Sequence, residues 1–287
     1  MLGRDLVSCL EPRHCVLPLN RKEADITDSG AVDRALEKAE PDIVIHCAAF
    51  TAVDDCEIEP QLAFNVNAEG THSVARACRR WDIPLLYLST DYVFDGEKTE
   101  PYVETDPPNP LNVYGKTKLA GEESVKELAA RFWIVRVSWL FGPWGRNFVR
   151  TILEQAQRGQ PLRIVADQVG APTYTMHLAE KIEDIFTAAE GGIYHVTNQG
   201  YCSWFEFARE ILRQAGLDDI TISPIASSAL DRRARRPRNS RLANTRLEAS
   251  SLGLLPPWKD AVCSYLARAA QAQEPSGQPA FGRSRLR

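Results

Sequence analysis

The amino-acid sequence predicts an α/β fold, in which a doubly wound parallel sheet carries a smaller second α/β domain. Continuous apolar runs at 41–49, 84–90 and 133–138 are typical of strands that are buried on both faces, as in parallel sheets. Segments of helical periodicity separate these runs and produce repeated strand–helix–strand units. With 287 residues, 44% of them hydrophobic and 25% charged, the chain has the composition of an ordinary globular protein of one or two domains.

The first part of the chain, 1–141, supplies the elements of the predicted sheet. A helix over 4–10 ends near Pro12, and the short apolar run 15–20 indicates a strand. Asp28 can cap the helix that follows it. From there the predicted elements alternate in order: helix 31–39, strand 41–49, helix 63–81, strand 84–90, helix 114–130 and strand 133–138. This alternation predicts a Rossmann-like domain, whose ligands bind at the carboxyl ends of the strands.

Past Gly142 the alternation loosens, which predicts a smaller α/β domain over 142–269 that mainly binds the substrate. Its predicted elements are helices over 148–158, 177–189 and 204–215 and strands over 162–165, 193–196 and 221–224. From 270 the composition shifts to Gln, Pro, Gly, Ser and Arg, which can bury little surface. We therefore expect 270–287 to be a disordered tail.

Charge and cysteine content exclude several classes of protein. Lys and Arg number 34 against 38 Asp and Glu, and this net charge of −4 argues against a general nucleic-acid or anionic-membrane binder. No apolar run approaches the roughly 20 residues that span a bilayer, and the N-terminus lacks the pattern of a signal peptide. The seven cysteines are odd in number and show neither CxxC nor zinc-ligand spacing, so we expect reduced thiols, a cytoplasmic location and no metal site.

Tyr114 and Lys118 are the candidate acid–base pair. Their spacing of four residues places both on one face of the predicted helix. An ordinary tyrosine has a pKa near 10, and a neighbouring ammonium favours the phenolate and lowers that pKa. The pair can then exchange a proton with a carbonyl or alcohol oxygen. The spacing alone also fits an ordinary surface pair.

Ser89, Thr90 and Asp91 stand at the end of a predicted buried strand, at the edge of the sheet where ligands bind. The hydroxyls of Ser89 and Thr90 could bond a substrate oxygen beside Tyr114. The alternative for all three residues is a capping or turn role.

The beginning of the chain departs from the usual pattern of a nucleotide-binding sheet, which opens with a strand, a glycine-rich turn and a helix. Here the chain opens at Met1-Leu-Gly3-Arg, and Gly3 is expected to be the last glycine of such a turn, where helix and strand pack closely. The first strand and the earlier glycines are then missing. The alternative is that the helix over 4–10 simply begins the fold.

Four segments together carry a family resemblance: STDYVFDG from 89, ETDPPNPLNVYGKTKLAGE from 104, RVSWLFG from 136 and DQVGAPTYT from 167. Over roughly 1–268 the chain resembles the extended short-chain dehydrogenase/reductase superfamily and, more narrowly, the dTDP-4-dehydrorhamnose reductase family. Tyr-x3-Lys marks only the superfamily, whereas the other segments are much more specific.

The resemblance implies a nicotinamide cofactor on the first domain and a nucleotide-sugar substrate. It makes Tyr114 the proton donor, with Lys118 lowering its pKa and holding the nicotinamide ribose. It places Thr90 beside the reacting C4 oxygen, and Asp91 and Trp139 against the sugar nucleotide. Besides Tyr114 and Lys118, the cofactor-binding positions that it implies are Gly3, Asp25, Ile26, Ala49, Phe50, Thr51 and Leu88.

Several of these positions have structural alternatives. Trp139 could belong to the core, and Asp25 could act, like Asp28, only as a helix-capping residue. Arg21 stands where a site that prefers NADH often carries an acidic residue, and it could pair with a 2′-phosphate, which favours NADPH while leaving NADH open. It could also be a solvated loop residue. The arginine-rich run 232–241 is either a solvated loop or supplies guanidinium groups to the substrate diphosphate.

The implied reaction is reduction of the C4 keto group of dTDP-4-dehydro-L-rhamnose to dTDP-L-rhamnose by hydride from NAD(P)H. Two alternatives stay open: a non-catalytic subunit resembling the regulatory β subunit of methionine adenosyltransferase, and an epimerase or dehydratase acting on another nucleotide sugar. The oligomeric state, including a homodimer, is left open as well.

Overall fold

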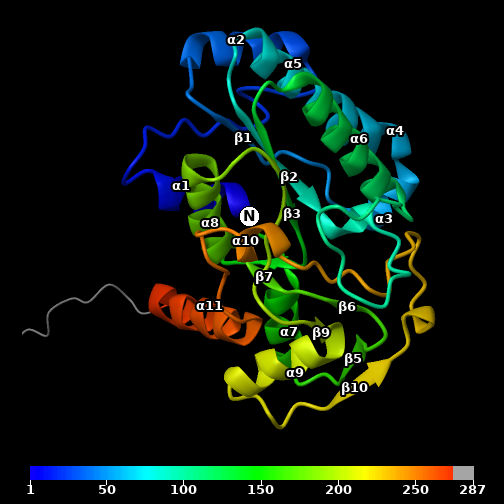
Figure 1. The fold of residues 1–287 in the computed structure, drawn as a ribbon. Helices are drawn as coiled ribbons and strands as arrows, with labels where there is room; N and C mark the ends of the chain where they lie inside the picture. Colours follow the sequence, from blue (N-terminus) through cyan, green and yellow to red (C-terminus); the bar gives the residue numbers. More distant parts are fainter. Residues whose placement is uncertain (274–287) are drawn as a thin grey trace, which may run out of the picture.

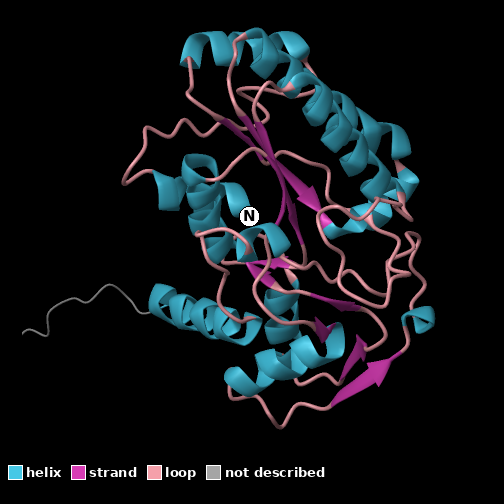
Figure 2. Cartoon of the chain, viewed as in Figure 1, coloured by secondary structure: helices cyan, strands magenta, loops and turns pink. Residues whose placement is uncertain are grey.

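The structure is a computed structural model that describes residues 1–273, and at its centre lies a four-stranded parallel sheet (Figures 1 and 2). The strand order is β1-β2-β3-β8, where β1 is Val44–His46, β2 is Leu85–Thr90, β3 is Phe132–Val137 and β8 is Gly192–His195. All three pairings are parallel. The carboxyl ends of the strands therefore lie at one edge of the sheet.

Helices cover both faces of this sheet. Leu86 and Leu88 of β2 belong to a core shared with α1 (Leu2–Leu10) and α8 (Thr175–Ala188). Leu85 and Tyr87 point to the opposite core, which contains residues of α2 (Ser29–Ala39), α5 (Gly70–Arg80) and α6 (Val113–Leu128). Successive side chains of a strand alternate between its faces, so these two cores confirm the predicted doubly wound α/β fold.

A separate core lies in the lower part of Figure 1, between α7 (Phe148–Gln157), α9 (Trp204–Gln214) and α11 (Trp258–Gln273). The parallel pair β5 (Leu162–Val165) and β10 (Ile222–Ile225) lies beside it. Both β8 and α8 come from the predicted second domain, yet they pack into the sheet of the first. The division at 141/142 stays a prediction.

The remaining elements are short and connect these layers. They are the helices α3 (Val53–Ile58), α4 (Pro60–Phe64) and α10 (Thr245–Glu248), the π-helix η1 (Asn65–Glu69), the 3-10 helices η2 (Asp91–Val93) and η3 (Ser227–Ala229), and the strands β4 (Leu140–Phe141), β6 (Val169–Gly170), β7 (Thr173–Tyr174) and β9 (Cys202–Ser203).

The predicted strand over 15–20 is wrong, because this segment has no regular structure. Leu17 and Leu19 are 61% and 46% exposed, and Pro18 between them has no N–H for a ladder. The predicted strand 41–49 is confirmed only over Val44–His46, which form an edge of the sheet. The predicted helix over 63–81 is present but contains the π-helical turn η1. Of the predicted tail 270–287, the first residues continue α11 to Gln273, and the rest lies outside the described residues.

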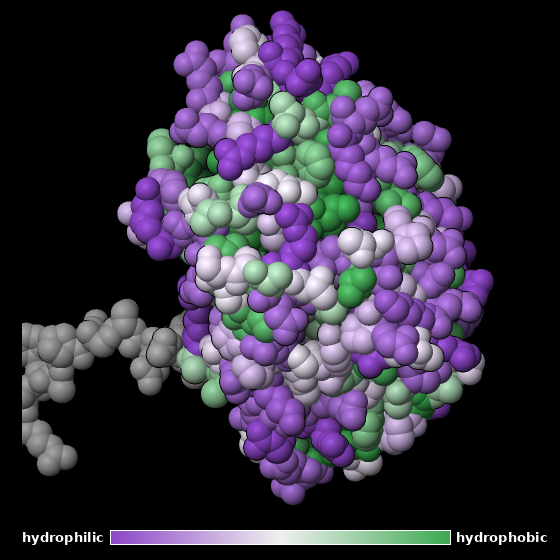
Figure 3. Space-filling view, in the orientation of Figure 1, coloured by the Kyte–Doolittle hydropathy of each residue, from purple (hydrophilic) through white to green (hydrophobic). Residues whose placement is uncertain are grey.

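The face of the molecule in Figure 3 is mainly hydrophilic at its two ends, with hydrophobic residues gathered between them. Among residues 1–273 no helix combines the length and apolar character that a membrane crossing requires. The seven cysteines are unpaired.

Candidate active site

The carboxyl edge of the sheet brings the predicted catalytic residues together. Thr90 ends β2 and is the register partner of Val137, which ends β3. Asp91 and Trp139 follow these two strands, and the segment 47–51 follows β1. Parallel pairing therefore places residues from three distant parts of the sequence at one edge, as the strand pattern predicted.

Tyr114 lies in the first turn of α6, beside Thr90. Burial raises the pKa of Tyr114 above its ordinary value, and a hydrogen bond with the Thr90 side chain acts in the opposite direction. The ring also meets that of Tyr92 edge to face, with centroids 5.9 Å apart. The expected net lowering of the Tyr114 pKa is thus wrong, because burial dominates.

The start of α6 is fixed by three local contacts. The Asn112 side chain caps the helix by accepting from the backbone N–H of Gly115 at 2.8 Å. At Gly115 the helix passes so close to η2 that a Cβ would lie 2.1 Å from the carbonyl oxygen of Tyr92. Glu57 accepts from the backbone N–H of Val113 at 2.8 Å. These contacts hold Tyr114 next to the end of β2.

Lys118 lies one turn further along α6 and is only 2% exposed. Its Nζ is 4.1 Å from the centroid of the Tyr87 ring, a cation–π contact, rather than against Tyr114. Burial lowers the pKa of Lys118 to about 7, and the Glu122 carboxylate acts in the opposite direction. Within residues 1–273 no hydrogen bond of this ammonium is found, so it is free to donate to a ligand.

Ser89, Thr90 and Asp91 do different things. Ser89 donates to Glu122 Oε1 at 2.5 Å and is buried, so the expectation that its hydroxyl faces a substrate is wrong. Thr90 donates to Asp91 Oδ1 at 3.0 Å and caps η2 by accepting from the N–H of Tyr92. Burial raises the pKa of Asp91 to about 7, and the side chains of Ser240 and Thr90 oppose this shift. Its Oδ2 is buried and has no hydrogen bond of ordinary geometry among the described residues. Thr90 therefore has the predicted capping role as well as its contact with Tyr114.

The segment after β1 is held by a residue that the sequence did not reveal. Asn67, in the π-helix η1, accepts from the N–H of Phe50 at 2.7 Å and donates to the carbonyl of Phe50 at 3.0 Å. The same side-chain nitrogen lies 3.0 Å from the hydroxyl of Thr117, between Tyr114 and Lys118 on α6. Asn67 thus ties the expected cofactor-lining segment to the catalytic helix. π-Helical turns often occur at functional sites, but nothing in the local sequence predicts one here.

The other predicted cofactor positions are less uniform. Asp25 accepts from Thr27 and from Arg21, which lower its pKa to about 2, while Asp28 caps α2 as expected. The Ile26 side chain packs closely against Gly70, where an added Cβ would lie only 2.8 Å from it. Ala49 is half-buried and Thr51 is exposed.

Two cofactor predictions meet physical difficulties. Leu88 is 8% exposed and belongs to the core that contains residues of α1 and α8. Gly3 lies in the first turn of α1, and a Cβ there would meet nothing within 4 Å. The close helix–strand contact expected at this glycine is therefore absent. Whether either residue touches a cofactor stays a prediction.

Trp139 is held in a constrained arrangement. Its φ of 46° lies in the left-handed region, which is uncommon for a residue other than glycine. Its ring stacks on that of Trp204, with centroids 3.5 Å apart and planes 8° apart. A Cβ at Gly170 would lie 2.4 Å from the same ring. Trp139 is therefore neither ordinary core nor freely exposed, and Trp204, which the sequence analysis missed, belongs to the same group.

The arginine-rich segment is docked on the first domain rather than merely solvated. Arg236 forms two hydrogen bonds to the Asp54 carboxylate, at 2.9 and 2.7 Å, and its side chain is only 11% exposed. Burial raises the pKa of Tyr92, the neighbour of Tyr114, to about 12, and the charges of Arg236 and Arg232 oppose this shift. Arg232 forms no ion pair within residues 1–273. The segment thus brings positive charge to the predicted active site.

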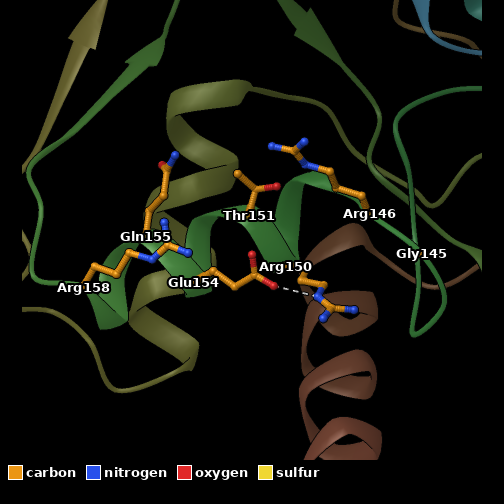
Figure 4. Close-up of a pocket in the computed structure, with 7 residues that line it drawn as sticks. All are labelled: Gly145, Arg146, Arg150, Thr151, Glu154, Gln155 and Arg158. Atoms are coloured by element: carbon orange, nitrogen blue, oxygen red, sulfur yellow. Dashed lines mark hydrogen bonds and ion pairs between the residues drawn. The ribbon is translucent and has the colours of Figure 1, made fainter.

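A surface pocket of about 450 Å³ lies elsewhere, along α7 and the loop before it. Figure 4 shows its lining side chains, of which Arg150 and Glu154 form an ion pair of 2.7 Å. None of the predicted site residues lines this pocket. We therefore locate the active site at the carboxyl edge of the sheet and not at this surface pocket.

Comparison with known proteins decides among the families that share this fold. The family described as "RmlD substrate binding domain" matches residues 1–271. The chain belongs to the dTDP-4-dehydrorhamnose reductase family. A dTDP-4-dehydrorhamnose reductase of Streptomyces griseus is 42% identical, with 97% of this chain and 94% of the relative covered.

Other members of the dTDP-4-dehydrorhamnose reductase family agree in fold and reaction class. The crystal structure of the reductase from Bacillus anthracis str. Ames, in complex with NADP, superimposes with a TM-score of 0.91 at 38% identity, covering 93% of this chain and 95% of that chain. A protein of Streptomyces antibioticus, named a probable dTDP-4,6-dihydroxy-2-methyloxan-3-one 4-ketoreductase, is 39% identical over 91% of this chain and 90% of its own length.

Proposed function

We propose that this protein reduces the C4 keto group of dTDP-4-dehydro-L-rhamnose to give dTDP-L-rhamnose, with NADPH as the reductant. The observation that carries the proposal is the contact of Tyr114 with Thr90 at the carboxyl edge of a parallel sheet, with Lys118 one turn further along the same helix, in a chain of this reductase family. Relatives named for 4-keto reduction support it over a non-catalytic subunit and over an epimerase or dehydratase.

In this proposal Tyr114 protonates the carbonyl oxygen of the substrate. Because its pKa is raised, the phenol keeps its proton at neutral pH, as a proton donor requires. The Thr90 side chain fixes the orientation of the phenol. Asp91 Oδ2, buried without a partner, is positioned to accept a hydrogen bond from a sugar hydroxyl.

The residues present fit a nicotinamide cofactor. The buried ammonium of Lys118 has no hydrogen-bond acceptor in residues 1–273, and the ribose hydroxyls of a dinucleotide would supply one. Phe50 and Thr51 would line the same side of the site, and Asp25 and Ile26 would flank the adenine. When bound, NADPH supplies the hydride that reduces C4 of the sugar. The NADP in the relative from Bacillus anthracis supports this choice over NADH.

Arg232 is the proposed ligand of the substrate diphosphate. Arg236 is already occupied by Asp54, whereas Arg232 has no ion pair among the described residues and lies close enough to act on Tyr92. A guanidinium group matches phosphate oxygens in charge and geometry. Trp139 and Trp204 would present aromatic surface to the sugar nucleotide.

The test is NADPH consumption with dTDP-4-dehydro-L-rhamnose, with the sugar product identified by chromatography. We expect turnover by the wild type and a loss of about 100-fold or more for Tyr114→Phe, with substrate affinity largely kept. Tyr201→Phe, a tyrosine outside the site, is the matched control. A protein that consumes no NADPH with any 4-keto nucleotide sugar would refute the proposal.

We also infer a cytoplasmic location, since seven unpaired cysteines fit a reducing compartment. A homodimer stays a prediction, which sedimentation equilibrium of the purified chain would test.

A further inference from the structure

A row of buried polar side chains crosses the sheet beneath the catalytic helix. Ser89 of β2, Arg136 of β3 and His195 of β8 are register partners on adjacent strands. They face the same side of the sheet as α6, which carries Glu122 one turn beyond Lys118. None of these four side chains forms a hydrogen bond with a side chain that we assign to substrate or cofactor binding.

Glu122 is fully buried, and both of its oxygens are occupied. Its Oε1 accepts from Ser89 Oγ at 2.5 Å and from Arg136 Nε at 2.9 Å, and its Oε2 accepts from Arg136 Nη2 at 2.7 Å. Lys126 lies 4.0 Å from Oε2 at the outer side. One carboxylate thus joins α6 to β2 and to β3.

The row continues to the far strand of the sheet. Arg136 Nη1 lies 3.5 Å from His195 Nε2, while His195 Nδ1 is 3.1 Å from the carbonyl oxygens of Tyr102 and Ala243. A ring nitrogen facing carbonyls must carry the proton, which leaves Nε2 to accept from the guanidinium. Burial lowers the pKa of His195 to about 4, so this ring is neutral at pH 7. Among residues 1–273 the ion-pair partner of Arg136 is Glu122.

A buried ion pair of this kind is seldom needed for stability. Replacing one by apolar residues of similar volume is often neutral or stabilising, because burial costs each ion its hydration. The position of the Glu122–Arg136 pair is therefore better explained by the predicted catalytic residues next to it. Thr90 directly follows Ser89, and Lys118 and Tyr114 lie one and two turns before Glu122.

We propose that Glu122 is a positioning residue of the active site: it fixes α6 on β2 and β3 and supplies the negative charge that faces Lys118. This inference rests on the proposed function, because it concerns how that reaction is supported. Glu122 touches neither substrate nor cofactor in this account and acts only through its neighbours.

The surroundings of Lys118 make the charge of Glu122 important. Burial lowers the pKa of Lys118, and Glu122 is the first group that opposes this shift. Among the described residues, the titratable groups that act on or contact Lys118 are His46 and Cys47 at the end of β1, Tyr87 on β2 and Glu122 on α6. The Met1 amino group acts in turn on Cys47. Burial keeps His46 neutral by lowering its pKa to about 3 and raises the pKa of Cys47 to about 12, so neither competes with Glu122 at neutral pH.

The experiment compares Glu122→Gln with Glu123→Gln, its exposed neighbour on the same helix. The glutamine keeps the size and one acceptor but removes the charge. We expect kcat to fall about tenfold or more, with KM for NADPH and for the sugar nucleotide changed less than about threefold. The falling limb of kcat at high pH should move to lower pH, because Lys118 loses its proton more easily without a carboxylate beside it.

A double variant, Glu122→Leu with Arg136→Met, separates positioning from stability. It removes both buried charges, so thermal unfolding should stay close to that of the wild type. A low kcat in this stable variant supports the inference. This result remains informative if Glu122→Gln does not fold. Wild-type kcat in the double variant overturns it, as does a Glu122→Gln protein whose kcat and pH profile match those of Glu123→Gln. Absence of turnover in the wild type instead refutes the proposed function.

Discussion

Trp139 and Trp204 stack face to face, with ring centroids 3.5 Å apart and planes only 8° apart. Trp139 follows β3 at the edge of the sheet, whereas Trp204 begins α9 in the other core. Phe148 of α7 packs against Trp204 with centroids 4.6 Å apart. The stack therefore joins the predicted substrate region to the catalytic edge.

We predict that Trp204→Ala weakens binding of the sugar nucleotide more than it slows the chemical step. Without Trp204 the Trp139 ring loses the aromatic face on which it stacks, and aromatic pairs are worth about 0.5–1.5 kcal/mol beyond their buried area. KM for the sugar nucleotide should rise about tenfold, with a smaller change in kcat. Steady-state kinetics measures this, and Trp81→Ala, at the end of α5, should change neither constant.

Arg232→Gln should raise KM for the sugar nucleotide by about tenfold, because one guanidinium–phosphate contact is lost. KM for NADPH should stay the same if the arginine serves the substrate diphosphate. Arg233→Gln, an exposed arginine next to it, is the control. Equal KM values for the two variants would show that Arg232 is only a surface residue.

Arg21 should set the preference for NADPH over NADH. Its side chain is 78% exposed, and its Nε lies 2.9 Å from Asp25 Oδ2. The guanidinium group is therefore at the surface, where it can contact a 2′-phosphate. Arg21→Ser is expected to raise KM for NADPH about tenfold and to leave KM for NADH unchanged. The comparison variant is Lys22→Ser, and a parallel rise for both cofactors would contradict a role in phosphate recognition.

Asn67→Ala should both destabilise the protein and weaken NADPH binding. The substitution removes the hydrogen-bond partner of the Phe50 N–H and leaves the Phe50 carbonyl with only the Cys56 thiol, which costs about 1–3 kcal/mol. Denaturant unfolding and a fluorescence titration with NADPH measure the two effects. Asn65→Ala, an exposed asparagine in the same π-helix, should preserve both. Unchanged NADPH affinity in Asn67→Ala would mean that the segment after β1 does not line the cofactor.

The sheet and its catalytic helix could be predicted because their signals are local. Buried apolar runs mark β2 and β3, and Tyr114 and Lys118 share a helix face whatever surrounds them. The strand over 15–20 was predicted from the same kind of run, but exposure of Leu17 and Leu19 depends on what neighbours them in space. The pKa of Tyr114 was predicted from Lys118 alone, although burial decides its direction.

The missed residues act through contacts between distant parts of the chain. Trp204 becomes part of the site only by stacking on Trp139, and Asn67 only by binding Phe50 and Thr117. Glu122 belongs to the KLAGE stretch of α6, but the sequence does not indicate that it pairs with Arg136 on β3. No spacing rule connects such pairs, so the structure was needed to find them.

The most direct test of the central claim uses NADPH that carries deuterium in place of the transferable hydrogen. After reaction with dTDP-4-dehydro-L-rhamnose, mass spectrometry and NMR locate the label in the sugar product. Our account predicts one deuterium at C4 of dTDP-L-rhamnose for the wild type and almost no labelled product for Tyr114→Phe. Label at another carbon, or a changed sugar without label, would contradict the account and indicate an epimerase or dehydratase.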